Sequence, residues 1–436
     1  MLSLLAFLGM TTLLLLEGWC ILSVFGLKKG SIKIALSLPV AAVSSTILIL
    51  LLTVFSIPLT PLSIIAAHIL LMGITLFGKT KKIFSLPEKP ESATSKFILI
   101  LCTLLLLITA AYSTTHSLLL PTFHYDSAVN WNMRSKVSFL EKKLVLAESH
   151  EHILKPHYPF LYHALQITVE QGQTQWSDRA ANAIHFLLSL SAILALFLMI
   201  QSLGGRTAAL LAVTLIVTTP LFAMHLGGGY ADVPLTLFAL LSLTTFFLSS
   251  KTSGQRWLLL SALFVSACVW TKAEGLPFCL LPWLLMLGAH WWEHPQERKQ
   301  DAYAALLALC LSLLWPLFAL ARGLPLSPHG SYDLGIGLQE GALAAAFHAM
   351  FTGGSFGVIF PLALFTSLFL LFRPTENAGY RWGLLWGLSS LAAILFVYLF
   401  TNNAVFLLNG QSFDRQLLLP CALLLLTLSL SFAAKR

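Results

Sequence analysis

Five short polar stretches interrupt a chain that is otherwise rich in apolar residues, and they contain the residue types that chemistry needs. Ionisable residues inside apolar helices or at their ends cost several kcal/mol unless they are paired or face water, so each stretch is a functional hypothesis. Five such stretches together are stronger evidence for a functional site than any one of them alone. They are HYDSAVNWNMRSK (124–136), KPHYPFLYH (155–163), GGGYADVP (227–234), TKAEGLP (271–277) and NGQSFDRQLLLP (409–420).

The residue types in these stretches suit the transfer of a sugar away from a lipid-linked phosphate. Such a reaction needs a base that removes the acceptor's proton and cations that stabilise the departing phosphate. An acid is not needed, because phosphate leaves as a stable anion. Asp126 is the candidate catalytic base. We expect the lipid phosphate to be bound by Lys272, Arg415 and Arg179, and the rest of the substrate to be bound or positioned by His157, Tyr158, Asp232, Arg134 and Glu274.

The composition of the chain indicates the environment in which these residues lie. Hydrophobic residues make up 57% of the 436 residues and charged residues 10%, and the mean hydropathy is +0.83, which together indicate an integral membrane protein. The net charge of +8 comes from short basic clusters between apolar runs, so nucleic acid is not an expected partner. The six cysteines lie in apolar segments without CxxC spacing, which predicts neither disulfides nor a zinc site.

Apolar runs that are long enough to cross a bilayer recur along the chain. Hydrocarbon about 30 Å thick requires roughly 20 helical residues. The first run is expected to be a retained helix, because it contains Glu17 and lacks a small-residue cleavage site. We predict an all-α polytopic membrane protein with about thirteen spans, at residues 3–26, 34–57, 61–78, 97–118, 180–202, 207–226, 231–249, 257–272, 275–291, 303–321, 356–373, 382–400 and 416–433.

The distribution of basic residues predicts the orientation. Lys and Arg favour the cytoplasmic side of short loops, and most of the 26 fall on one side if the connection at residues 28–33 is cytoplasmic. The opposite side then carries two long loops, 119–179 and 322–356. Loops longer than about 12 to 15 residues are usually functional or disordered, and the first contains amphipathic, helix-compatible pieces at 127–143 and 158–171. We therefore expect the site on the outer, extracytoplasmic face of the membrane.

A basic, Pro-containing stretch at residues 79–96 is the only linker-like segment. It is predicted to be cytoplasmic and to divide three leading helices (1–78) from a body of ten helices (97–436).

The order of the motifs carries a family resemblance. An apolar helix, an outer loop with Asp126, and then HYPFLY, GYADVPL, TKAEGLPF and DRQLLLP resemble bacterial membrane glycosyltransferases of the GT-C superfamily. The resemblance is to the dolichyl-phosphate-mannose-protein mannosyltransferase-like group that includes the aminoarabinose transferases, and it runs roughly from Phe97 to the C-terminus. It implies that Asp126 is the catalytic base and that Lys272 and Arg415 hold the lipid phosphate.

The chain departs from that family's pattern in two respects. Many relatives carry paired acids where this chain has Asp126 followed by Ser127, and three additional helices precede the expected first helix.

Each candidate residue also has a structural interpretation. Asp126 and Asp232 could be helix N-caps, Lys272 could pair with Glu274, and Arg415 could be an interfacial anchor. The glycines at 227–229 favour a tight turn. Histidines and Glu151 cluster at 150–157 without the HExxH spacing, so no metal site is predicted, although a divalent cation stays an open alternative.

Three functions fit these observations. The preferred one is inverting transfer of a sugar from a polyprenyl-phosphate donor to an extracytoplasmic glycan, lipid or protein acceptor. A transporter or flippase of lipid-linked sugars is the main alternative, but it would place its charges near mid-bilayer in repeated halves. A third alternative is an oligosaccharide polymerase or ligase, which would use a large outer loop rich in Arg and His.

Overall fold

Helices build the described part of the chain. The computed structural model describes residues 2–28, 30–78, 84–87, 94–122, 124–146, 158–252, 254–324, 337–372 and 378–433. Within these ranges the only strand-like pairing is a single bridge between Leu27 and Phe84. The α-helices and the short π- or 3₁₀-helices (η) are α1 (Leu2–Phe25), α2 (Gly30–Val54), α3 (Pro61–Phe77), α4 (Lys96–Thr114), η1 (Thr115–Leu119), η2 (Ser127–Asn132), α5 (Met133–Glu141), α6 (Leu161–Glu170), α7 (Asp178–Gly204), α8 (Arg206–Val217), α9 (Pro220–Leu226), α10 (Asp232–Thr252), α11 (Gln255–Thr271), η3 (Leu276–Leu280), α12 (Leu281–Glu293), η4 (Pro295–Glu297), α13 (Arg298–Ala321), α14 (Ala342–Phe347), η5 (His348–Thr352), α15 (Ile359–Leu371), α16 (Ala378–Phe400), α17 (Ala404–Leu408) and α18 (Phe413–Ala433).

The prediction of an all-α polytopic membrane protein is confirmed. Ten of the thirteen predicted spans each fall on one helix, whereas 97–118 covers α4 and η1, 207–226 covers α8 and α9, and 275–291 covers η3 and α12. Among the described residues, eight helices are long and apolar enough to cross a membrane alone. A ninth is obtained if α8 and α9, which meet at 78°, count as one broken span. Pro220 starts α9 and has no backbone N–H to donate, which explains the break. Several of the remaining predicted spans form shorter helices, such as α3, α11 and α15.

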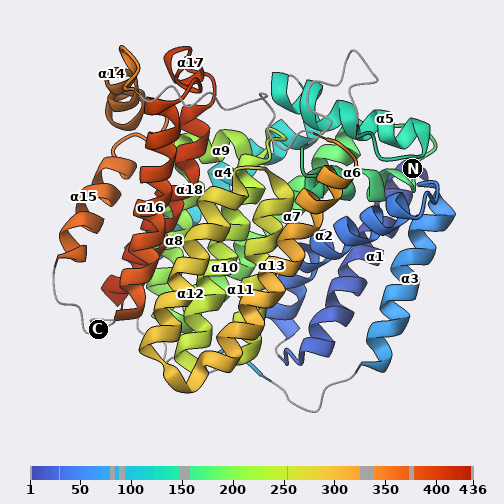
Figure 1. Ribbon diagram of the computed structural model, residues 1–436, viewed down its shortest axis with the longest axis horizontal. Coiled ribbons are helices and arrows are strands. Elements are labelled where there is room, and N and C mark those ends of the chain that lie inside the picture. Colours follow the sequence, from blue (N-terminus) through green and yellow to red (C-terminus); the bar gives the residue numbers. More distant parts are fainter. Residues whose placement is uncertain are drawn as a thin grey trace.

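The helices run between two ends of the molecule that differ in structure (Figure 1). The upper end carries the short helices α5, α6, α14 and α17, which lie across or above the long ones. The lower end carries the turn between α12 and α13 and the C-terminus. The described helices of the two predicted long loops therefore lie at the same end, and the pieces expected to be helical in the first loop form η2, α5 and α6.

A buried polar trio joins the three leading helices. Glu17 in α1 accepts a hydrogen bond from the Ser44 hydroxyl in α2, and its other carboxylate oxygen contacts Nδ1 of His68 in α3. All three side chains are buried. Because each residue comes from a different helix, the trio fixes how these helices face one another.

The leading helices also pack against the outer helices of the body. The backbone N–H of Leu59, between α2 and α3, donates to the carbonyl of Lys142 at 2.7 Å, just after α5. After α6, the Gln173 amide donates to the carbonyl of Ser3 at 2.9 Å. Residues 1–78 are thus joined to the rest of the chain at the upper end as well as through the linker.

The described part of the predicted linker is anchored. Phe84 packs edge-on against Trp257 with ring centroids 4.8 Å apart, and its carbonyl accepts from the N–H of Lys28 at 3.0 Å. Most of the remaining linker lies outside the described residues.

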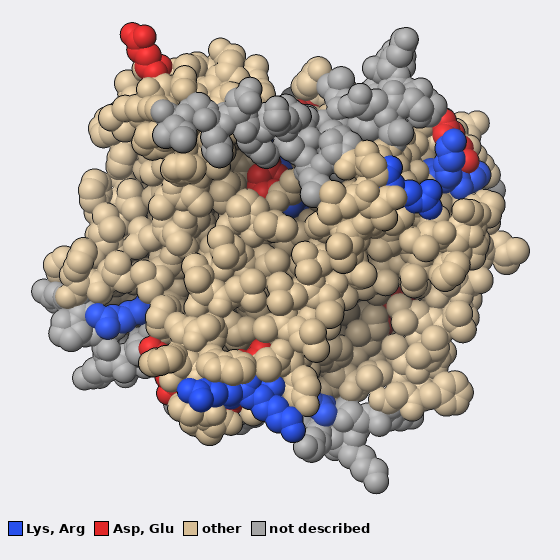
Figure 2. All heavy atoms as spheres, viewed as in Figure 1, with Lys and Arg blue, Asp and Glu red and all other residues tan. Residues whose placement is uncertain are grey.

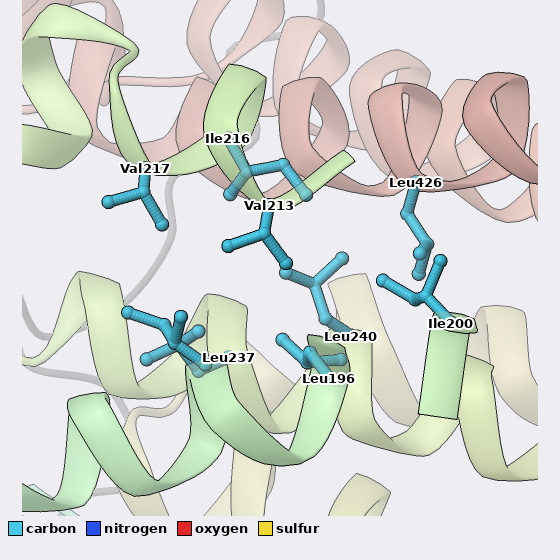
Figure 3. A pocket seen from close by; sticks show the side chains of 9 residues that line it. Leu196, Ile200, Val213, Ile216, Val217, Leu237, Leu240 and Leu426 are labelled. Carbon is cyan, nitrogen blue, oxygen red and sulfur yellow. The ribbon is translucent and has the colours of Figure 1, made fainter. Parts of the chain in front are cut away.

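The interior between α7, α8, α10 and α18 is apolar. A cavity of about 10 Å³ lies there, lined only by Ile, Leu and Val side chains that include Val213, Leu237 and Leu426 (Figure 3). This cavity offers no polar group for chemistry.

Candidate active site

Five charged side chains meet at the upper end of the bundle and form what we call the charge cluster: Asp126, Arg415, Asp232, Lys272 and Glu274. Acids and bases alternate along it. Arg415 pairs with Asp126 and has an Asp232 oxygen 3.9 Å from its Nη1. Lys272 Nζ lies 2.9 Å from Asp232 and 3.3 Å from Glu274. Sequence analysis predicted all five residues as site residues, and the fold brings them together.

Helix ends place these residues. Asp232 is the first residue of α10, Lys272 follows the last residue of α11 in an extended conformation, and Arg415 lies in the first turn of α18. Asp126 directly precedes η2. Since all four are held by the ends of helices that pack together, the cluster is positioned by the bundle and does not depend on a single loop.

The carboxylate of Asp126 does not act as a helix cap. Its backbone is helical, with φ −61° and ψ −38°, and its side chain makes no capping hydrogen bond. One carboxylate oxygen accepts from the Asn130 amide at 3.0 Å, and the other contacts Arg415. About a quarter of the Asp126 side chain, 23%, is exposed. A carboxylate at this position is partly exposed and can therefore be reached by an acceptor.

Asp232 and Lys272 form the buried half of the cluster. Their side chains are only 4% and 6% exposed, whereas that of Glu274 is 24% exposed. The amide of Gln416 donates to Glu274 at 3.2 Å. Lys272 does pair with Glu274, as the structural interpretation of the sequence suggested, but it also forms an ion pair with Asp232. Removing one partner of such a buried ion pair leaves the other charge unpaired and destabilises the folded protein.

A glycine-rich turn presses the segment before Asp232 against the segment that carries Asp126. A Cβ on Gly227 would lie 2.6 Å from the Ser113 carbonyl oxygen. Gly229 has φ +74°, which disfavours any other residue. The hydroxyl of Ser127 donates to the carbonyl of Gly228. The turn predicted from these glycines thus also fixes the approach of two site segments.

Tyr230, Asn130 and Gln416 are members of the site that sequence reasoning missed. Tyr230 lies under the Arg415 guanidinium, whose central carbon is 5.2 Å from the ring centroid. Burial raises the pKa of the Tyr230 phenol despite the opposing effect of Arg415, so the phenol is neutral near pH 7. Their closeness in sequence to predicted site residues could have identified them. Asn130 follows Asp126 by one helical turn, Tyr230 lies two residues before Asp232, and Gln416 directly follows Arg415.

Arg134 and Arg179 lie apart from the charge cluster, whereas Tyr158 belongs to a buried cluster with Trp131, Tyr162 and Ala231, the residue that directly precedes Asp232. Arg134 is fully buried, where its Nε donates to the Val145 carbonyl at 3.0 Å and its Nη1 to the Tyr158 carbonyl at 2.6 Å. Burial lowers the pKa of Arg134 to about 9, so it stays charged near neutral pH. Tyr158 packs on Trp131 with ring centroids 5.8 Å apart. Arg179 is exposed at the start of α7. Their predicted substrate roles stay predictions.

His157 and the other histidines of residues 150–157 lie outside the described residues. Within the described ranges, no group of three or more His, Cys, Asp or Glu side chains could hold a metal ion.

Charged side chains lie in a recess of the molecular surface. Figure 2 shows acidic and basic side chains together in a recess near the upper end, whereas the lower rim carries mainly basic side chains on this face. Charges at the floor of a recess can act on a bound headgroup with less screening by solvent than charges on a flat surface.

Two comparisons relate the chain to known proteins. The model of the dolichyl-phosphate-mannose-protein mannosyltransferase family matches residues 156–318. Among solved structures, ArnT from Cupriavidus metallidurans, crystallised with undecaprenyl phosphate, has 14% sequence identity to this chain and a TM-score of 0.52. The likeness covers 79% of this chain and 61% of that one, so the chain spans about three fifths of the length of ArnT. No curated protein matches the sequence.

The structural likeness establishes a shared fold, and the family match covers the segment that contains Asp232, Lys272 and Glu274. Together they confirm that this membrane protein resembles the GT-C glycosyltransferases, in the mannosyltransferase-like and aminoarabinose transferase-like group.

Proposed function

We propose that the protein transfers a sugar from a polyprenyl-phosphate donor to a glycan, lipid or protein acceptor on the outer face of a bacterial cytoplasmic membrane, with inversion at the sugar carbon. The sugar is a hexose or a pentose. The observation that carries the proposal is the contact between Asp126 and Arg415, which are 289 residues apart in the sequence, within a cluster of alternating carboxylates and cations. The family match and the undecaprenyl phosphate bound to ArnT support a lipid-phosphate donor.

The reaction is a single displacement. The acceptor hydroxyl oxygen forms a bond to the sugar carbon while the bond from that carbon to the phosphate oxygen breaks, and the electron pair leaves with polyprenyl phosphate. Asp126 takes the hydroxyl proton as general base. Arg415 and Lys272 stabilise the negative charge that grows on the phosphate, and attack from the face opposite the leaving group inverts the sugar carbon.

Arg415 has a donor available for this task. Its Nε is buried and has no hydrogen-bond partner among the described residues. Leaving such a donor unpaired costs about 1–3 kcal/mol, which an anionic ligand would recover. A phosphate is a suitable acceptor because the guanidinium can donate two parallel hydrogen bonds to two of its oxygens.

The pair of Asp126 and Arg415 must open before both can act. While they are paired, one carboxylate oxygen of Asp126 and Nη1 of Arg415 occupy each other and are not free to contact the acceptor and the phosphate. An incoming phosphate competes with Asp126 for Arg415. Donor binding would therefore free the base at the moment when the donor is in place.

Incubation of the purified protein in detergent with a panel of polyprenyl-phosphate sugars and candidate acceptors tests the proposal. We expect one donor to be converted to free polyprenyl phosphate. If every donor survives and the protein instead moves lipid-linked sugar across vesicle membranes, the transporter interpretation replaces this one.

The proposed orientation has its own test. Tyr125 is 66% exposed, so a cysteine introduced there should react with an impermeant maleimide added to intact cells. A cysteine at Arg381, which is exposed at the start of α16, should react only after the cells are opened. The reverse labelling would place the charge cluster on the cytoplasmic side.

A further inference from the structure

The ring of Tyr230 contacts three side chains, those of Arg415, His225 and His124. The Arg415 guanidinium carbon is 5.2 Å from the ring centroid. The ring of His225 stacks on Tyr230 with centroids 4.1 Å apart and an angle of 15° between the planes. His225 is only 3% exposed, so the imidazole is a buried support for the tyrosine ring.

The backbone of Tyr230 is equally constrained. The preceding glycines pack against Ser113 and Ser127, and the Ser127 hydroxyl donates to the Gly228 carbonyl. Ser127 follows Asp126 directly in the sequence. The ring is therefore held in a constant position relative to the two residues that the proposed reaction needs most, Asp126 and Arg415.

An aromatic face differs from a carboxylate as a partner for Arg415. A cation over a ring is attracted by the negative face without using its N–H groups as hydrogen-bond donors. When a phosphate replaces Asp126, the carboxylate contact is lost but the ring contact persists. Tyr230 can thus keep the guanidinium in place while its N–H groups turn toward the phosphate.

We infer that Tyr230 is a positioning residue, which holds Arg415 through its ring and so determines how well the lipid phosphate binds. The inference rests on the proposed function and adds a specific role for the GGGYAD motif. The phenol hydroxyl is not required, because the contact is made by the ring.

Binding of undecaprenyl phosphate to purified variants in detergent tests the inference. Tyr230→Leu removes the ring, and we expect binding to weaken about 5- to 30-fold, as a partly desolvated cation–π contact implies. Tyr230→Phe keeps the ring and should bind like wild type. Tyr230→Met provides a second ring-free variant in case the Leu variant does not fold. Tyr303→Leu, at an exposed tyrosine of α13, is the matched control and should bind like wild type.

A double-mutant cycle separates positioning from general damage. In an Arg415→Ala background, Tyr230→Leu should cause no further loss of binding, because its partner is already absent. An equal loss in both backgrounds would overturn the inference, and so would wild-type binding by both ring-free variants. If the wild-type protein itself does not bind undecaprenyl phosphate, the proposed function fails rather than the role of Tyr230.

Discussion

The polar trio and the charge cluster, two of the buried polar groups among the described residues, differ in composition and in position. The polar trio of Glu17, Ser44 and His68 lies midway along three helices and satisfies itself with one carboxylate, one hydroxyl and one imidazole. The charge cluster lies at helix ends, alternates three acids with two bases, and leaves Asp126 and Glu274 about a quarter exposed.

The difference shows that burial of an ionisable group does not by itself mark an active site. A polar group inside a membrane protein can be fully used in holding helices together. An active site needs in addition a charged group that is exposed and a hydrogen-bond donor or acceptor that is unpaired. In the charge cluster, Asp126 is the exposed charged group and the Nε of Arg415 is the unpaired donor. The following changes test this distinction.

Asp126→Asn should have the largest effect on activity. Asn keeps the shape and the hydrogen bond with Asn130 but cannot take a proton, so transfer should fall by roughly 10²- to 10⁴-fold. Release of polyprenyl phosphate measures the rate, and the apparent melting temperature in the same detergent checks the fold. Near wild-type turnover of the Asn variant would exclude Asp126 as the base.

Arg415→Ala should weaken donor use by about 10- to 100-fold, because charge-assisted hydrogen bonds to the phosphate are lost. Arg415→Lys should recover only part of this loss, since the planar guanidinium is absent. The measurement is the dependence of rate on donor concentration. Arg381→Ala, at the opposite end of the molecule, is the control. Equal donor dependence in Arg415→Ala and wild type would remove Arg415 from the phosphate site.

Glu17→Leu should affect stability and leave the transfer rate unchanged. It removes the carboxylate partner of the His68 ring, whereas the Ser44 hydroxyl keeps the Val40 and Ala41 carbonyls as acceptors, and this should cost about 1–2 kcal/mol in the free energy of unfolding. The double variant Glu17→Leu with His68→Leu should recover much of this loss, because both strong polar partners are gone. A stable Glu17 variant with a reduced transfer rate would show that the trio does influence the active site.

Glu170→Gln should have the smallest effect on transfer, because it should change only the pH dependence of stability. Glu170 is fully buried at the end of α6, and burial raises its pKa from 4.5 to about 8. Between these values the unfolded chain has lost the proton that the folded protein keeps, so stability should fall as pH rises from about 4.5 to 8. Melting temperatures at pH 5 and above pH 8 measure this difference, which should be smaller in the Gln variant. An identical pH dependence would show that Glu170 is ionised in the folded protein.

The charged members of the site could be predicted from the sequence for an energetic reason. Its five charged residues interrupt or border apolar runs, where an unpaired charge is costly, so their positions in the sequence already identify them as candidates: Asp126, Asp232, Lys272, Glu274 and Arg415. The same criterion selected Arg134, which the structure places inside the outer helices on the Val145 and Tyr158 carbonyls. A local pattern cannot distinguish these cases, because the partner of a charged residue is set by the packing of distant segments.

The sequence by itself determined the membrane environment, the helical class and the charged candidates, because hydropathy and the cost of unpaired charge act locally along the chain. Only the tertiary structure decided which acid meets which base, that Tyr230 supports Arg415, and that the leading helices pack on the outer ones through Leu59 and Gln173. These contacts join residues far apart in the chain. They depend on how whole helices pack, which requires shape complementarity in three dimensions.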